Sequence, residues 1–197
     1  MRAKRLATLL LGAWLGAGLF MSWVAASNFD SVDSVIKSSA GRMQFEVKEI
    51  GSERLRMILR HHSGEQNRHY FSQWEWIQLL LGAILAVLLL FETNANRVIM
   101  AMSLLMLAIT AIQHFTITPQ IIEIGRSIDF SSSEDMVPER QVFWNYHRAY
   151  SVLEVLKLGA GFVLSLRLLY GTSRTSKRRR RKKVDSVDDA DHSHVDG

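Results

Sequence analysis

Two ionisable side chains interrupt an apolar stretch in the last third of the chain. Glu154 and Lys157 lie three residues apart, so in a helix they share one face. A charged group inside a membrane-spanning helix costs about 2.5 to 3.5 kcal/mol, so we expect both to face other helices and to pair. His147 lies seven residues before Glu154, on nearly the same side of a helix. The spacing predicts a polar site within the membrane-spanning part of the protein.

Gln113 and His114 are the expected partners of this site from another helix. They lie near the end of an uncharged run from Val98 to Phe115. The functional interpretation of the five residues together is a substrate or proton site. The alternative is a local ion pair in which Glu154 reaches toward the outer interface.

Metal or haem binding is a second interpretation of His114 and His147. Neutral imidazoles bind copper, zinc or haem iron. No carboxylate or thiol stands at a fixed ligand spacing beside either histidine, and the chain has no cysteine. We therefore expect no cofactor, with interfacial histidines bonded to a loop as the ordinary explanation. No phosphate-binding loop, nucleophile elbow or His-Glu-x-x-His pair is present, so nothing in the sequence indicates an enzyme.

Four apolar runs are long enough to position these side chains within a membrane. Each approaches the roughly 20 residues that cross a hydrocarbon core of about 30 Å. The second and third runs are separated only by residues 92–97, which predicts an antiparallel hairpin. The sequence thus predicts an all-α integral membrane domain, a four-helix bundle over residues 1–171, with helices at about 6–26, 74–91, 98–115 and 147–170.

The first run has a competing interpretation as a cleaved signal peptide. Its basic start and the small residues before Ser27 fit a cleavage site. We favour a retained helix because the run is long for a signal core. Gly12 and Gly16 also lie four residues apart, a spacing that favours close helix packing in lipid.

A run of seven basic residues follows the fourth apolar run. Such clusters mark the cytoplasmic side, and the chain also begins with basic residues, so both termini are expected in the cytoplasm and the number of spans is even. We expect a bacterial inner membrane or plasma membrane location. The same cluster is expected to contact anionic lipid headgroups through Lys177, Arg178, Arg179, Arg180, Arg181, Lys182 and Lys183.

Two polar regions flank the predicted spans. Residues 28–73 show apolar spacings of three, four and seven, which predicts an outer amphipathic helical segment with breaks near Gly41 and Gly51. The segment either lies on the membrane or caps the bundle. Residues 172–197 are charged and almost free of large apolar side chains, so we expect a disordered cytoplasmic tail.

The expected partners are lipids and proteins rather than nucleic acid. The net charge is +5, but residues 172–197 carry +3 of it, and a nucleic-acid binder would spread its basic residues over a folded face. The bilayer is the principal expected partner. A second copy of the chain or another membrane protein is a further candidate that the sequence leaves open.

Three short stretches resemble one small membrane family. They are Gly12-Ala13-Trp14-Leu15-Gly16 with the residues that follow to Phe29, Asn94-Ala95-Asn96-Arg97, and Phe143-Trp144-Asn145-Tyr146-His147 leading to Glu154. They resemble the domain of unknown function 4149 family, which is similar to transmembrane protein 205. The resemblance covers about residues 6–170 and implies a four-helix membrane protein without a defined activity.

These observations together predict a non-enzymatic, multi-pass membrane protein. Its expected role is that of a small transporter subunit or a membrane scaffold, with metal or haem handling through the outer histidines as the alternative. The transported species, the oligomeric state and the partner proteins are not predicted by the sequence.

Overall fold

The computed structural model describes residues 2–38, 41–91, 97–130 and 137–192, and these ranges are almost entirely helical. The prediction of an all-α protein is confirmed for this part of the chain. The helices are α1 (Arg2–Ser38), α2 (Arg42–Ile50), α3 (Ser52–Leu90), α4 (Arg97–Ile112), a π-helical turn η1 (Gln113–Ile117), α5 (Thr118–Ile128) and α6 (Val137–His192).

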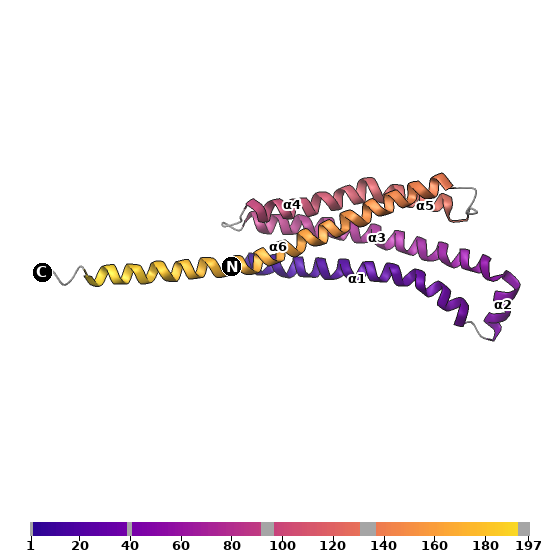
Figure 1. Cartoon of the computed structure of the whole chain (residues 1–197), viewed down its shortest axis with the longest axis horizontal. Coiled ribbons are helices and arrows are strands. Elements are labelled where there is room, and N and C mark those ends of the chain that lie inside the picture. Colours follow the sequence, from indigo (N-terminus) through magenta and orange to yellow (C-terminus); the bar gives the residue numbers. More distant parts are fainter. Residues whose placement is uncertain (1, 39–40, 92–96, 131–136, 193–197) are drawn as a thin grey trace.

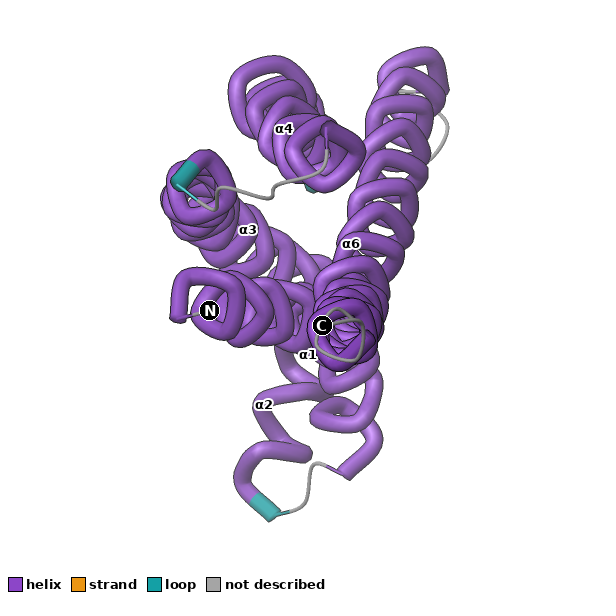
Figure 2. Tube along the Cα trace, turned by 90° about the vertical axis from the view of Figure 1, so that its left-hand side faces the viewer, coloured by secondary structure: helices purple, strands orange, loops and turns teal. Residues whose placement is uncertain are grey.

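Four helices pack side by side along most of their shared length (Figure 1). Helix α3 contacts α1 and α4, and α6 contacts α4 and α1, so each of the four touches two of the others. In the end-on view of Figure 2, α6 crosses the group at an angle. The start of α1, the end of α3 and the start of α4 lie at one end, where α6 also leaves the packed region (Figure 1).

The apolar core follows helical spacings of three and four. Ala7, Leu11 and Trp14 form one stripe along α1, and Leu164 and Leu168 lie on the facing side of α6. Helices α3 and α4 complete this core with Trp74, Leu85, Leu89 and Met106. These buried side chains pack the helices together toward the end of the group that lies nearest to the basic residues at the start of α1 and to the basic residues 177–183.

Three helical segments are long and apolar enough to cross a membrane, namely α1, α3 and the continuous stretch from Arg97 to Ile128. They correspond to the first three predicted spans. Helix α6 is not among them, and its apolar part carries Glu154, Lys157 and Arg167.

Residues 28–73, predicted to be an outer segment, continue α1 and α3 rather than forming a separate unit. Helix α1 extends to Ser38, and α3 runs without a break from Ser52 into its apolar half. The chain turns at Gly41 and Gly51, whose φ angles of 62° and 87° favour glycine, close to the predicted breaks. Figure 1 shows α2 joining the far ends of α1 and α3.

The last part of α1 and the first part of α3, joined by α2, form a hairpin that we call the outer hairpin. Polar contacts fix its two arms to each other. Asn28 Nδ2 donates to Asn67 Oδ1 at 2.6 Å, and Asn67 Nδ2 donates to the Ala25 carbonyl at 3.0 Å. Further out, Arg56 Nε lies 2.9 Å from Asp33 Oδ1. The segment is thus an extension of two packed helices, which neither of the two expected arrangements describes.

The prediction of a tail without secondary structure is wrong for most of its length. Helix α6 continues to His192, well beyond Gly171. Residues 172–192 contain neither glycine nor proline, and Lys and Arg are good helix formers, so nothing in this segment interrupts the helix once α6 has started it. The low hydrophobicity of the tail does not exclude a single helix.

Close helix contacts are made by other glycines than the sequence suggested. A β-carbon at Gly12 or Gly16 would have no neighbour within 4 Å, so these two residues do not mark a tight interface. At Gly161 of α6, by contrast, a β-carbon would lie 2.6 Å from Leu15 Cδ2 and 3.0 Å from Met106 Cε. The nearest approach of α6 to α1 and α4 therefore depends on Gly161.

We predict that Gly161→Val destabilises the folded protein by about 1 to 3 kcal/mol, the usual cost of overpacking an interior. Gly159→Val is the matched control, because a β-carbon there meets nothing within 4 Å on the same helix. Thermal unfolding in mild detergent measures both variants. Equal unfolding temperatures for the two variants would contradict the assignment of Gly161 to the tight contact.

Candidate functional site: a buried polar cluster

Glu75 of α3 is the most deeply buried charged residue in the helix interior, with no exposed surface. Each of its carboxylate oxygens has a partner on the neighbouring chain segment. His114 Nδ1 lies 3.0 Å from Oε2, and the Thr118 hydroxyl donates to Oε1 at 2.6 Å. Neither Glu75 nor Thr118 was among the site residues predicted from the sequence.

Lys157 and Glu154 form the ion pair that their spacing predicted. Lys157 Nζ lies 2.7 Å from Glu154 Oε2, and the Lys157 side chain is 1% exposed. Gln113 links the pair to the next helix, since its Oε1 accepts from Lys157 at 2.8 Å and its Nε2 donates to Glu154 Oε2 at 3.1 Å. Three of the five predicted site residues therefore meet. The ion pair faces other helices and does not reach the outer interface alone.

Two more side chains bring further polar atoms to this level of the helices. Tyr150 of α6 interacts electrostatically with Glu75 and Glu154, and its buried hydroxyl makes no hydrogen bond of good geometry. Gln78 of α3 accepts from Trp14 Nε1 at 3.0 Å, which leaves its buried Nε2 without a partner. The cluster thus contains buried donors that the described residues do not satisfy.

The π-helical turn η1 explains why adjacent residues serve different neighbours. Gln113 turns toward α6, whereas His114 turns toward Glu75 on α3, and Thr118 follows His114 by four residues to reach the same carboxylate. Turns of this kind insert a residue into an α-helix and recur at functional sites. Pro119 near the start of α5 fits the first turn of a new helix.

The missed residues were visible as a stripe in the sequence. Glu75 and Gln78 continue the buried positions Gly82, Leu85 and Leu89 at alternating spacings of three and four. Two tryptophans flank Glu75 in the sequence, of which Trp76 is exposed and Trp74 belongs to the core.

His147 lies outside the cluster, so its predicted place is wrong. His147 is exposed, and its ring stacks on Phe143 with 6.0 Å between the ring centroids. Two helical turns of about 5 Å each separate it from Glu154, and Tyr150 lies on the intervening turn. The structure does not bring His147 and His114 into a common ligand set, which removes the geometric support for a metal or haem site between them.

An open groove of about 700 Å³ lies on the surface between α3 and α5. Its lining includes Ser72, Phe115, Pro119 and Ile122, together with His114 and Thr118. The last two are the residues that hydrogen-bond Glu75. His114 is 11% exposed, and the ring of Trp76 packs against it at 4.5 Å. The groove therefore leads to the partners of the buried carboxylate.

A second polar group ties the outer part of α3 to the end of α5. Asp129 accepts from Arg68 at 2.9 Å and lies 2.7 Å from His61 Nδ1, and Glu65 bonds both Arg68 and Arg126. Glu65 lies before the apolar half of α3. Hydrogen bonds from Arg126 and Arg68 lower its pKa to about 2.

The atoms of His61, Glu65 and Asp129 are close enough together to bind a metal ion. Two guanidinium groups already neutralise both carboxylates, so a divalent cation would add positive charge beside two arginines. We interpret this group as an ionic link that positions α5, and hence His114 and Thr118, against α3.

Comparison with known proteins adds no family assignment. No protein-family model, curated protein or solved structure matches this chain. The resemblance to the domain of unknown function 4149 family therefore stays a prediction.

We predict that Glu154→Leu alone destabilises the protein by about 3 to 5 kcal/mol, because it removes the carboxylate that lies 2.7 Å from the buried Lys157. The double variant Glu154→Leu with Lys157→Met should be more stable than that single variant. Unfolding in detergent, analysed as a double-mutant cycle, measures the coupling. Val155→Leu, at an exposed position of α6, is the control. Additive effects would show that the two side chains act independently.

Proposed function

We propose that the chain is an integral membrane protein that crosses the bilayer four times, with both termini in the cytoplasm. Its role is that of a small, non-enzymatic transporter subunit in a bacterial inner membrane or plasma membrane. The helices α1, α3, α4 and α6 supply the spans, and the buried polar cluster is the binding centre. The scaffold interpretation from the sequence is less favoured, because a scaffold has no need of this centre.

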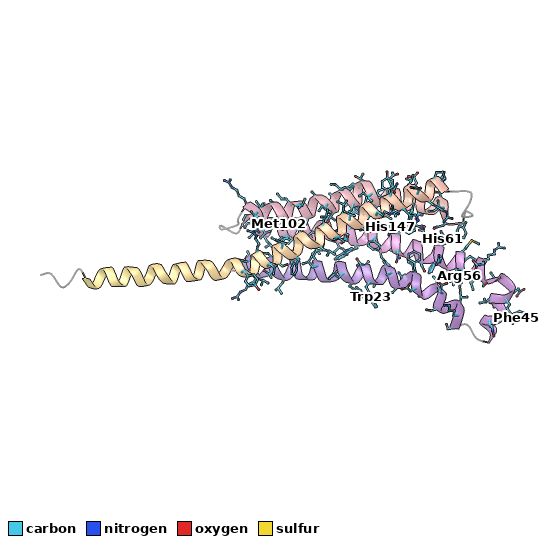
Figure 3. All side chains as sticks on the ribbon, viewed as in Figure 1. Trp23, Phe45, Arg56, His61, Met102 and His147 are labelled. Atoms are coloured by element: carbon cyan, nitrogen blue, oxygen red, sulfur yellow. The ribbon has the colours of Figure 1, made fainter. Side chains whose placement is uncertain are left out.

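The distribution of apolar side chains supports the membrane location. Large apolar residues remain exposed all around the packed helices, among them Leu9, Trp23, Leu80, Val155 and Phe162. A water-soluble helix buries its apolar stripe, whereas a helix that is apolar on every side belongs in a protein interior or in lipid. The side chain of Trp23 on α1 points away from the other helices (Figure 3).

The observation that carries the functional proposal is the complete burial of Glu75 among helices of this kind. An ionisable group at such a position is costly, and by default it is a candidate for a substrate, ion or proton pathway. Lys157 and Glu154 add two further charges at the same level. The groove beside His114 supplies a route to the cluster from the outer end of the helices.

We predict that the chain is labelled from outside only on its outer hairpin. The absence of native cysteine allows single-cysteine variants to report the topology directly. A membrane-impermeant maleimide should label Ser34→Cys in intact cells. It should label Ser176→Cys only after the cells have been permeabilised. Labelling of both positions in intact cells, or recovery of the chain in the soluble fraction, would contradict four spans with internal termini.

Water access to the cluster distinguishes a transporter subunit from a scaffold. Single-cysteine variants of the same chain can measure this access. Ser72→Cys, in the groove, should react with a small charged thiol reagent in membranes. Ile84→Cys is the matched control on the same helix, at an exposed apolar position expected to face lipid. Equal protection of both cysteines would favour the scaffold.

The seven basic residues from Lys177 to Lys183 are proposed to contact anionic headgroups. Each basic residue near such a surface contributes about 1 kcal/mol, and salt screens the attraction. We predict slower trypsin cleavage within the cluster in anionic nanodiscs than in neutral nanodiscs at low salt. The difference should vanish at high salt, and equal rates in both lipids at low salt would contradict the contact.

A further inference from the structure

We infer that His114 and Glu75 form a proton-binding site that exchanges with the outer side of the membrane through the groove. This inference rests on the proposed function and specifies its ligand class, a single positive charge supplied as a proton. It starts from the charges of the cluster and from the position of His114 between the buried carboxylate and the surface.

The formal charges of the cluster do not cancel when Glu75 is ionised. Glu75 and Glu154 are each negative, Lys157 is positive, and a neutral His114 adds nothing. The cluster then carries one net negative charge among buried side chains. Such an uncompensated charge is expensive where water is excluded, so the cluster favours the uptake of one positive charge.

No other group that packs against Glu75 supplies that charge. Thr118 of α5 is neutral and Tyr150 of α6 has no positive form. Lys157 also interacts with Glu75, but it is already paired with Glu154 at 2.7 Å. On α1, Trp14 bonds Gln78 and Gly18 lies near Glu154, and neither of these two residues titrates. The neutralising charge must therefore come from outside the cluster.

A proton fits this position better than a metal cation. Both oxygens of Glu75 already have partners at 2.6 and 3.0 Å, and a proton shared between Oε2 and His114 Nδ1 requires no further space. A metal cation would need several oxygen ligands and would displace these hydrogen bonds. The observed geometry thus already contains the bond along which a proton can move.

His114 connects this bond to the surface. One ring nitrogen faces Glu75, and the same side chain lines the groove. A proton that arrives from the groove binds the free ring nitrogen Nε2 while Nδ1 passes its own proton to Glu75 Oε2. The imidazole is then neutral again and Glu75 is a neutral acid, so the net change is one proton gained.

The opposite side of the cluster is mostly apolar. Between Glu75 and the basic end of the helices lie Leu11, Leu85, Met106 and Leu164, each fully buried, together with the buried Ser103. The groove beside His114 is therefore the route that we assign to proton exchange.

The test uses an apolar carbodiimide, which adds to a carboxylic acid only in its protonated form. In the wild type in nanodiscs, labelling of Glu75 should rise as the pH falls. Glu75→Gln should lose this labelled peptide, and Glu53→Gln, an exposed acid on the same helix, should retain it. Labelling of Glu75 that is absent or independent of pH in the wild type overturns the proton site.

The variant His114→Gln distinguishes a role of His114 in proton exchange from a role in holding the structure. Glutamine can still hydrogen-bond Glu75 but cannot carry a proton, so after a downward pH jump labelling should slow by about tenfold or more while the unfolding temperature stays close to that of the wild type. An unchanged labelling rate in this variant removes His114 from the path and overturns the inference.

A third measurement distinguishes a proton from a metal cation as the missing charge. Replacing choline with sodium at constant pH and ionic strength should leave the labelling unchanged. Protection of Glu75 by sodium would identify a cation site and overturn the proton assignment. The maleimide topology assay reads the proposed function independently, so loss of pH-dependent labelling with an intact topology refutes only this inference.

Discussion

A carboxylate with no exposed surface requires neighbours that replace the hydrogen bonds of water. Glu75 meets this requirement with donors from the segment that follows α4, and the rest of the polar cluster is arranged around it. Gln113 lies beside His114 in the same turn, and it fixes Lys157 and Glu154 on α6. One buried charge therefore determines how α3, α4, α5 and α6 must be placed relative to one another.

The π-helical turn allows one stretch of chain to satisfy two helices at once. A regular α-helix would separate the directions of adjacent side chains by 100°, and its following turn would continue in the same register. The wider turn at Gln113–Ile117 changes that register before α5 begins. Arg126 and Asp129 then reach Glu65 and Arg68, which fixes the far end of α5 on α3.

The sequence predicts the parts of this fold that depend on local periodicity. The first three apolar runs, the breaks near Gly41 and Gly51, and the Glu154–Lys157 pair all follow from spacing along one helix. The contacts of Glu75 do not, because they depend on which helices are neighbours and on a π-helical turn that no residue type announces. His147 illustrates the same limit, since its helical phase matched Glu154 while its height along α6 placed it outside the cluster.

The continuity of α3 also has a mechanical consequence. If residues 74–90 occupy the hydrocarbon, residues 52–73 extend the same axis for about 33 Å beyond it, at 1.5 Å per residue. The end of α1 is bonded to this part of α3, so the two helices form a rigid arm rather than a flexible loop, with α2 at its tip. A force applied at α2 would turn α3 about the membrane boundary, close to the level at which Glu75 meets His114.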